Sequence, residues 1–259
     1  MKRERLDRLL VERGFVSSRE KAQAAILAGK VLVGGQVVFK PDALIDPEAP
    51  IALKAKEPYV SRGGLKLKGA LATFGIKVEG RICLDVGAST GGFTDCLLQE
   101  GAKRVYAVDV GYGQLHHRLR QDPRVVVLER TNIRYLLPET LPERPDLATI
   151  DVSFISLSLV LPPVVALLEE PVEIVALVKP QFEVGKGQVG KGGVVKDPEK
   201  HRAVLLQVGE RAEALGLRVL GITPSPLLGP KGNREFFIHL IKGSASRDLL
   251  PLVEAALAA

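Results

Sequence analysis

Short apolar runs alternate with amphipathic stretches along most of the chain, from residue 59 onward. The apolar runs cover residues 82–86, 104–110, 124–129, 147–152, 173–179, 218–224 and 236–241. Strands that alternate with helices in this way favour a parallel sheet with helices on both faces. The pattern therefore predicts an α/β fold for this part of the chain.

A helix is predicted immediately before the first of these strands. Ser61 is a suitable N-cap residue, and the apolar side chains that follow at helical spacing are Leu67, Ala70, Leu71 and Phe74. Lys66 lies on the same helix, beside this apolar stripe.

The first 55 or so residues have a different pattern, which predicts a separate small unit. One helix ends at Gly14, and a second is capped by Ser17 or Ser18 and ends at Gly29. The sequence VLVGGQVV then gives two strand-like pieces around a Gly-Gly turn, which is a hairpin pattern. We therefore expect a small α+β domain that occupies residues 1–58, including a linker, and a larger domain over 59–259.

The glycine-rich sequence LDVGASTGGFT, residues 84–94, follows the first strand of the larger domain. A phosphate-binding P-loop would need Gly-Lys-Ser/Thr, which is missing, and a dinucleotide-binding loop would need glycine where Ser89 stands. S-adenosylmethionine carries no phosphate, and Asp85 ahead of the loop would attract its ammonium group. Asp109, at the end of the next strand, could accept hydrogen bonds from both ribose hydroxyls. The alternative is a tight glycine turn, with Asp109 capping a helix.

Charged residues stand at the ends of several predicted strands. Asp151 and Lys179 each follow an apolar run, and Glu235 begins the last one. Because ligands bind at the carboxyl edge of a parallel sheet, Asp151 and Lys179 are expected in one crevice, and Glu235 joins them if the last strand is antiparallel. Burial lowers the pKa of a lysine, so such a set suits a general base. The alternative is ordinary ion pairs on a solvated edge.

Composition restricts the class of protein. The chain has 259 residues, of which 46% are hydrophobic and 25% charged, and its net charge of +6 weakly favours an acidic partner such as nucleic acid. Two cysteines, Cys83 and Cys96, and four histidines show no metal-binding spacing, so no metal is expected. With no signal segment and no apolar run of about 18 residues, we expect a cytoplasmic protein that does not span a membrane.

Several long motifs together resemble one known family. They are SREKAQAAILAGKVLVGG, YVSRGGLKL, CLDVGASTGGFTDCLL, DVGYGQL, DPRVVVLERTN, DVSFISL, VKPQFEVGKGQVGKGGVV and SPLLGPKGNREFF. They resemble the TlyA group, often named hemolysin A, which joins an S4 RNA-binding domain to an FtsJ/RrmJ-like rRNA methyltransferase domain. The resemblance covers nearly the whole chain.

The resemblance implies a Rossmann-like sheet, mostly parallel with an antiparallel last strand, and an S-adenosylmethionine-dependent ribose 2′-O-methyltransferase. Its catalytic set falls on Lys66, Asp151, Lys179 and Glu235. The residues expected to bind the cofactor are Asp85, Gly87, Ser89, Thr90, Gly91, Gly92, Phe93, Asp109, Val110 and Asn132, of which Asn132 would meet the adenine. The implied targets are cytidines in large-subunit and sometimes small-subunit rRNA.

Basic residues predict where RNA or a ribosomal subunit would bind. The candidates are Arg3, Arg5, Arg8, Arg19, Lys21 and Lys30 in the first domain, Arg62 at the start of the second, and Lys186 and Lys191 in a glycine-rich segment. The alternatives are a solvated helix face in the first domain and a flexible surface connection around the two lysines.

Three alternative functions fit the sequence less well. A membrane-active hemolysin would need a spanning segment or a basic amphipathic helix, and neither is seen. A non-catalytic RNA-binding module would not need the four charged residues at the sheet edge. An NAD-dependent enzyme would need the missing glycine of the loop.

Overall fold

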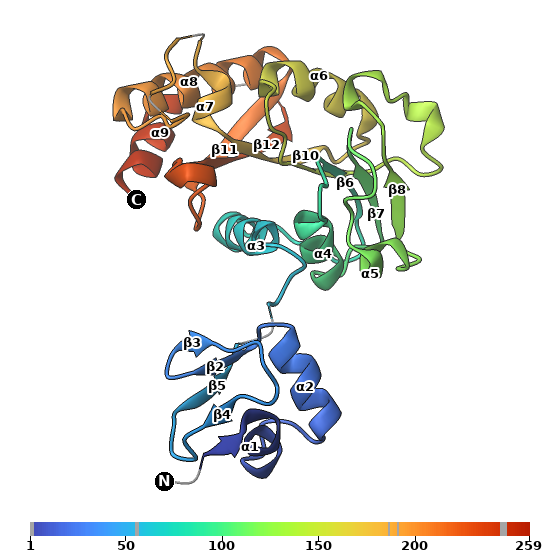
Figure 1. The fold of residues 1–259 in the computed structure, drawn as a ribbon. Helices are drawn as coiled ribbons and strands as arrows, with labels where there is room; N and C mark the ends of the chain where they lie inside the picture. Colours follow the sequence, from blue (N-terminus) through green and yellow to red (C-terminus); the bar gives the residue numbers. More distant parts are fainter. Residues whose placement is uncertain (1–2, 55–56, 186, 191, 244–247) are drawn as a thin grey trace. The chain divides into compact units, whose positions relative to one another are not determined.

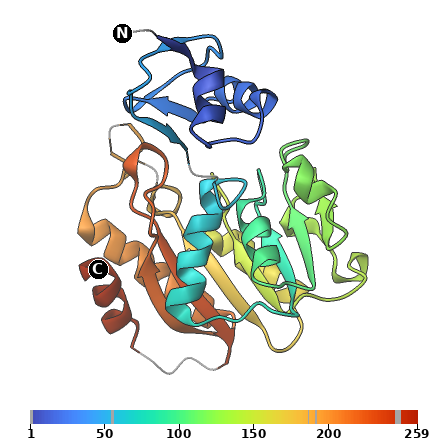
Figure 2. The same cartoon turned by 90° about the horizontal axis from the view of Figure 1, so that it is seen from below.

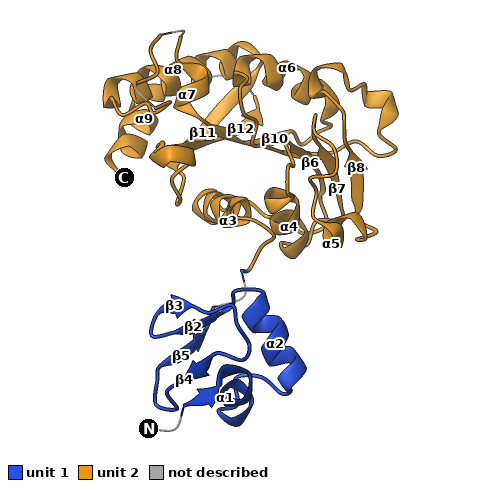
Figure 3. Cartoon of the chain, in the orientation of Figure 1, with its two compact units in different colours: residues 1–57 blue, residues 58–259 orange. Residues whose placement is uncertain are grey.

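The computed structural model describes residues 3–54, 57–185, 187–190, 192–243 and 248–259. It contains two compact units, Met1–Glu57 and Pro58–Ala259, whose boundary lies one residue from the predicted one (Figure 3). Among the described residues, no helix combines the length and the apolar character needed to cross a bilayer.

The first unit is a small α+β domain with a core of its own. Its elements are β1 (Glu4–Arg5), α1 (Leu6–Glu12), α2 (Arg19–Leu27), β2 (Val31–Val33), β3 (Gln36–Val37), β4 (Leu44–Ile45) and β5 (Ile51–Leu53). Ser18 is the N-cap of α2 and accepts a hydrogen bond from the Lys21 backbone N–H. The predicted hairpin is formed by β2 and β3, and β5 pairs with the other side of β2.

The second unit is built on a seven-stranded sheet in the order β11-β12-β10-β9-β6-β7-β8. The strands are β6 (Ile82–Val86), β7 (Arg104–Val108), β8 (Val125–Leu128), β9 (Leu147–Ile150), β10 (Glu173–Val178), β11 (Leu217–Pro224) and β12 (Phe236–Lys242). Strand β12 is antiparallel to both of its neighbours, whereas β6 to β10 are parallel. The predicted sheet is therefore confirmed, including the direction of its last strand.

Helices cover both faces of this sheet (Figure 1). One layer contains α3 (Arg62–Phe74), α4 (Gly92–Gln99) and α5 (His117–Arg120), and Figure 2 looks onto this face. The other layer contains α6 (Leu157–Leu167), α8 (Pro198–Ala214) and α9 (Leu249–Ala258). Because both faces are covered, the central strands β6, β9 and β10 are apolar along nearly their whole length.

The loops that follow the parallel strands lie at one edge of the sheet. The parallel strands β6, β9 and β10 end at this edge, and the antiparallel strand β12 begins there, with Phe236 paired to Val178. The short helices α7 (Pro180–Glu183) and η3 (Pro230–Gly232) belong to the loops that follow β10 and precede β12. This edge carries the site described next.

Candidate active site

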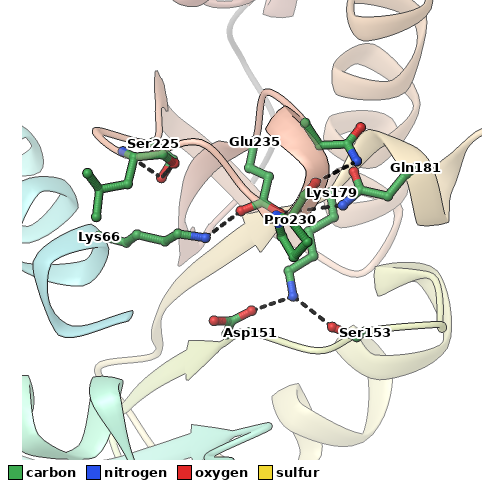
Figure 4. Close-up of polar contacts among 10 residues, drawn as sticks. Lys66, Asp151, Ser153, Lys179, Gln181, Ser225, Pro230 and Glu235 are labelled. Atoms are coloured by element: carbon green, nitrogen blue, oxygen red, sulfur yellow. Dashed lines mark hydrogen bonds and ion pairs between the residues drawn. The ribbon is translucent and has the colours of Figure 1, made fainter. Parts of the chain in front are cut away.

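The four charged residues predicted at the sheet edge meet in one cavity of about 400 Å³ (Figure 4). Lys179 directly follows β10, Asp151 follows β9, and Glu235 directly precedes β12. Lys66 reaches the cavity from α3. The expectation that these residues lie on one edge, rather than on separate surfaces, agrees with the structure.

The four residues form two ion pairs. Lys179 Nζ lies 2.6 Å from Asp151 Oδ1 and donates a second hydrogen bond to Ser153 Oγ at 3.0 Å. Lys66 Nζ donates to Glu235 Oε2 at 2.7 Å. The side chains of Lys179 and Lys66 are only 10% and 9% exposed, and that of Glu235 is fully buried. Since an unpaired buried charge is strongly destabilising, each cation depends on its carboxylate.

The Glu235 carboxylate is also confined from two other directions. Gln181 Nε2 donates to Glu235 Oε1 at 3.4 Å. A Cβ atom placed on Gly229 would lie only 2.0 Å from the same oxygen, so the backbone of Gly229 packs directly against the carboxylate. The position of Glu235 is therefore set by three groups from different segments of the chain.

Two glycines of the loop after β6 are required by contacts within the protein. Gly87 has a φ of +85°, and a Cβ there would lie 2.4 Å from the carbonyl oxygen of Asp151. A Cβ on Gly92 would lie 2.2 Å from Ser61 Oγ. Ser61 is the N-cap residue of α3 as predicted, but its side chain makes no capping hydrogen bond. Packing of the loop against Asp151 and α3 thus explains these two glycines.

A second cavity, of about 480 Å³, lies next to the first. It shares Gly87, Ser89, Asp151 and Ser153 with the first cavity, and its further lining includes Asp109, Val110, Asn132, Ile133, Val152 and Phe154. The Asp109 carboxylate accepts hydrogen bonds from the Ser89 and Gly111 backbone N–H groups, both at 2.7 Å. These bonds fix the position of the carboxylate beside the loop that follows β6.

The predicted cofactor residues do not all reach these cavities. Thr90, Gly92 and Phe93 line the first cavity. Asp85 and Gly91 line neither. Asp85 is fully buried beneath the loop, where it accepts hydrogen bonds from Thr94 Oγ1 at 2.6 Å and Thr149 Oγ1 at 3.3 Å. In this structure its carboxylate organises the base of the loop rather than facing a ligand.

Burial raises the pKa of Asp85 to about 7, with the nearby Asp151 charge acting in the same direction. Because the pKa is raised above the unfolded value, the contribution of Asp85 to stability is fully present below about pH 4 and is lost as the pH rises through about 7. The variant Asp85→Asn cannot ionise. We expect its stability relative to the unmodified protein to increase from about pH 4 to about pH 7, by at most about 1.4 kcal/mol per pH unit, and to level off above that. Urea unfolding over this range measures the difference, and a difference independent of pH would contradict the assignment.

Two of the predicted RNA-binding arginines have an internal partner. Arg5 and Arg19 both contact the buried Asp7 carboxylate, at 3.0 and 2.8 Å. The hydrogen bond from Arg5 is the main reason that the pKa of Asp7 lies well below its usual range. These two arginines thus stabilise the first unit, a contact that the basic pattern alone did not predict.

The other predicted RNA-binding residues are exposed or fall outside the described residues. Exposed side chains belong to Arg3, Arg8, Lys21, Lys30 and Arg62, and Arg62 also lines the first cavity. Lys21 Nζ donates to Ser17 Oγ at 2.8 Å. Lys186 and Lys191 lie outside the described residues.

An exposed aromatic residue beside the site was missed by the sequence analysis. Phe154 is 90% exposed, has a φ of +63°, and lies 4.9 Å from the Phe182 ring. Among the described residues, the other non-glycine residues with positive φ are Ser89, Arg130 and Lys231. All four lie in loops at the carboxyl edge of the sheet, and backbone strain of this kind collects at functional sites.

Comparison with known proteins identifies the family. Residues 59–242 match the FtsJ-like methyltransferase family. The chain belongs to this family. Residues 4–51 of this FtsJ-like methyltransferase match the S4 domain, so both parts of the predicted architecture are confirmed.

Several relatives of this FtsJ-like methyltransferase share its two-domain length. It is 52% identical to the 16S/23S rRNA (cytidine-2′-O)-methyltransferase TlyA of Mycobacterium tuberculosis, over 92% of this chain and 90% of that protein. It is 43% identical to Hemolysin A of Brachyspira hyodysenteriae, over 92% of this chain and 99% of that protein. A solved structure from Streptococcus thermophilus that carries the name hemolysin has a TM-score of 0.77 and 46% identity, covering 100% of this chain and 95% of that chain.

Proposed function

We propose that this enzyme transfers a methyl group from S-adenosylmethionine to a ribose 2′-hydroxyl of ribosomal RNA. The observation that carries the proposal is the pairing of Lys179 with Asp151 and of Lys66 with Glu235 in one cavity, directly beside the cavity that contains Asp109. A relative named for cytidine 2′-O-methylation of 16S and 23S rRNA supports a cytidine of rRNA as the target.

The residues of the second cavity fit S-adenosylmethionine. Its volume of about 480 Å³ is in the range of small-molecule sites. The apolar side chains of Val110, Ile133 and Val152 would contact the adenine, next to Asn132. Asp109, held by two backbone N–H groups, would accept hydrogen bonds from the ribose hydroxyls. When bound, the cofactor supplies an electrophilic methyl group on a sulfonium.

Lys179 is proposed as the general base. Its Nζ lies in the first cavity and is held by Asp151 and Ser153, which line both cavities; a neutral amine there would remove the proton of a hydroxyl group. Asp151 orients this amine, and the Lys66–Glu235 pair would orient the hydroxyl and stabilise the local charge. Methyl transfer requires the hydroxyl oxygen, the methyl carbon and the sulfur to lie in line. Side chains held in fixed positions around the hydroxyl would favour this alignment.

Surface groups around the cavities support RNA as the substrate. Arg62 stands at the rim of the first cavity. The Arg130 guanidinium lies 4.2 Å from the centre of the Tyr112 ring, and Arg134 lies 5.4 Å from that of Tyr135, on the loops after β7 and β8. Guanidinium and exposed aromatic groups together suit phosphates and unstacked bases. The S4 domain adds further exposed basic residues.

The cofactor assignment is tested by calorimetry with the full chain. Replacing Asp109 with alanine removes the carboxylate from the ribose position and from Ser89 and Gly111, so we expect the Kd for S-adenosylmethionine to rise about 10- to 100-fold. The control is Asp122→Ala, since Asp122 bonds to Arg124 outside both cavities and its loss should leave the Kd unchanged. Absence of binding by the unmodified protein, or binding of NAD in its place, would contradict the assignment.

A further inference from the structure

The buried side chain of Asn233 connects two loops that are distant in the sequence. Only 3% of this residue is exposed. Its Oδ1 accepts a hydrogen bond from the Val195 backbone N–H at 3.0 Å, and its Nδ2 donates to the Gly193 carbonyl at 3.0 Å and the Pro230 carbonyl at 3.2 Å. One amide side chain thus joins the end of the glycine-rich segment to the turn that leads into Glu235.

The turn itself has a conformation that needs support. Lys231 has a φ of +58°, which costs a non-glycine residue free energy. The Gly229 N–H donates to the Asn233 carbonyl at 2.8 Å and closes the turn around Lys231. Because the backbone of Gly229 also packs against the Glu235 carboxylate, the geometry of this turn is linked directly to the catalytic set.

The two loops form walls of a third cavity, of about 360 Å³, beside the proposed base. It is lined by Lys179 and Glu235 at the active site, by Phe154 and Phe182, and by Gly193 and Lys231 from the two connected loops. Asn233 lines this cavity but neither of the other two. The third cavity therefore lies where a nucleotide would approach Lys179, next to the Asp109 cavity, with which it shares Ser153 and Phe154.

The segment that supplies one wall of this cavity is rich in glycine, with Gly187, Gly190 and Gly193 among its described residues. Glycines lose more conformational freedom on ordering than other residues, so such a segment stays in place only if other contacts fix it. Val195 is held by its buried side chain, by the bond of its N–H to Asn233, and by the bond of its carbonyl to His201 Nε2 at 2.9 Å. Without the Asn233 amide, the Val195 N–H and the Gly193 carbonyl would each lose their hydrogen bond to this side chain.

We propose that Asn233 is a positioning residue that fixes the RNA-facing wall of the active site. The inference rests on the proposed function, because it assigns the third cavity to the RNA substrate. Asn233 acts through the loops it connects, without contact with the cofactor cavity. Its loss should therefore weaken the use of RNA and leave cofactor binding intact.

The two asparagines of the sequence, Asn132 and Asn233, allow a matched test with the full chain. We expect Asn233→Ala to raise the KM for rRNA at least tenfold at saturating S-adenosylmethionine, with the Kd for S-adenosylmethionine changed less than twofold. Asn132→Ala, in the cofactor cavity, is expected to raise the Kd for S-adenosylmethionine and to leave the KM for rRNA nearly unchanged. An unchanged KM in Asn233→Ala would overturn the inference. A parallel rise of KM and Kd with a lower Tm would also overturn it, because it would indicate a merely structural role.

Hydrogen exchange provides a readout that does not depend on methylation. In Asn233→Ala the Val195 amide should exchange at least tenfold faster, whereas amides of the central strand β9 should keep their protection. If the unmodified protein fails to methylate rRNA, the proposed function fails. The exchange rate of the Val195 amide then still shows whether Asn233 holds the end of the glycine-rich segment. An unchanged rate in Asn233→Ala would overturn the inference that it does.

Discussion

Replacing Lys179 with arginine is expected to lower the kcat for rRNA methylation by about 10²- to 10⁴-fold, although the positive charge is kept. An arginine guanidinium cannot give up its proton in a protein, so it can pair with Asp151 but cannot accept the proton of a hydroxyl. Lys179→Met should show a loss of similar size. Single-turnover transfer of a labelled methyl group measures the effect.

Two controls make the Lys179 result specific. Both variants should bind S-adenosylmethionine within a few-fold of the unmodified protein, since Asp109 and the apolar wall of its cavity are untouched. Lys103→Ala removes another lysine–carboxylate pair, with Glu143, on the exposed surface, and should keep full activity. Substantial turnover by Lys179→Arg would show that the residue supplies only charge and that another group is the base.

Replacing Gly229 with alanine is expected to reduce kcat about 10²-fold without direct loss of any charged group. The new methyl group would lie 2.0 Å from Glu235 Oε1 and 2.4 Å from its Cδ, so the carboxylate has to move. Its movement would separate it from Lys66, which lies 2.7 Å away. The measurement compares kcat with that of Glu235→Gln, which should show a loss of the same order.

Gly185→Ala is the matched control for this effect. Gly185 lies in the glycine-rich segment, and among the described residues a Cβ there would meet only Gln188 Nε2, at 3.4 Å. Activity near that of the unmodified protein is expected. If Gly229→Ala were equally active, with an unchanged Tm, the position of the Glu235 carboxylate would not limit the reaction.

The sheet and most of the site could be predicted because both depend on patterns in the local sequence. Apolar runs defined the strands, and residues that directly follow parallel strands share one edge, which placed Asp151 and Lys179 together. Glu235 required the direction of the last strand, which the residues alone left open. The family resemblance supplied that direction, and the register of β12 against β10 agrees with it.

The remaining features depend on contacts between segments that no local pattern encodes. The burial of Asp85 beneath its own loop depends on Thr149, from a strand more than sixty residues away. The pattern of basic residues predicted RNA contacts for Arg5 and Arg19 but gave no sign that both pair with the buried Asp7. The left-handed conformation of Phe154, whose exposed ring lies beside the cavity that contains Lys179, is likewise not indicated by the local sequence.

The most direct test of the central claim is to identify the methylated nucleoside. Ribosomal subunits from cells that lack this protein would be incubated with it and S-adenosylmethionine, and the rRNA then digested to nucleosides and analysed by mass spectrometry. We predict a gain of 2′-O-methylcytidine with the unmodified protein and none with Lys179→Arg. A methyl group on a base, or no methyl group on the RNA, would contradict the account.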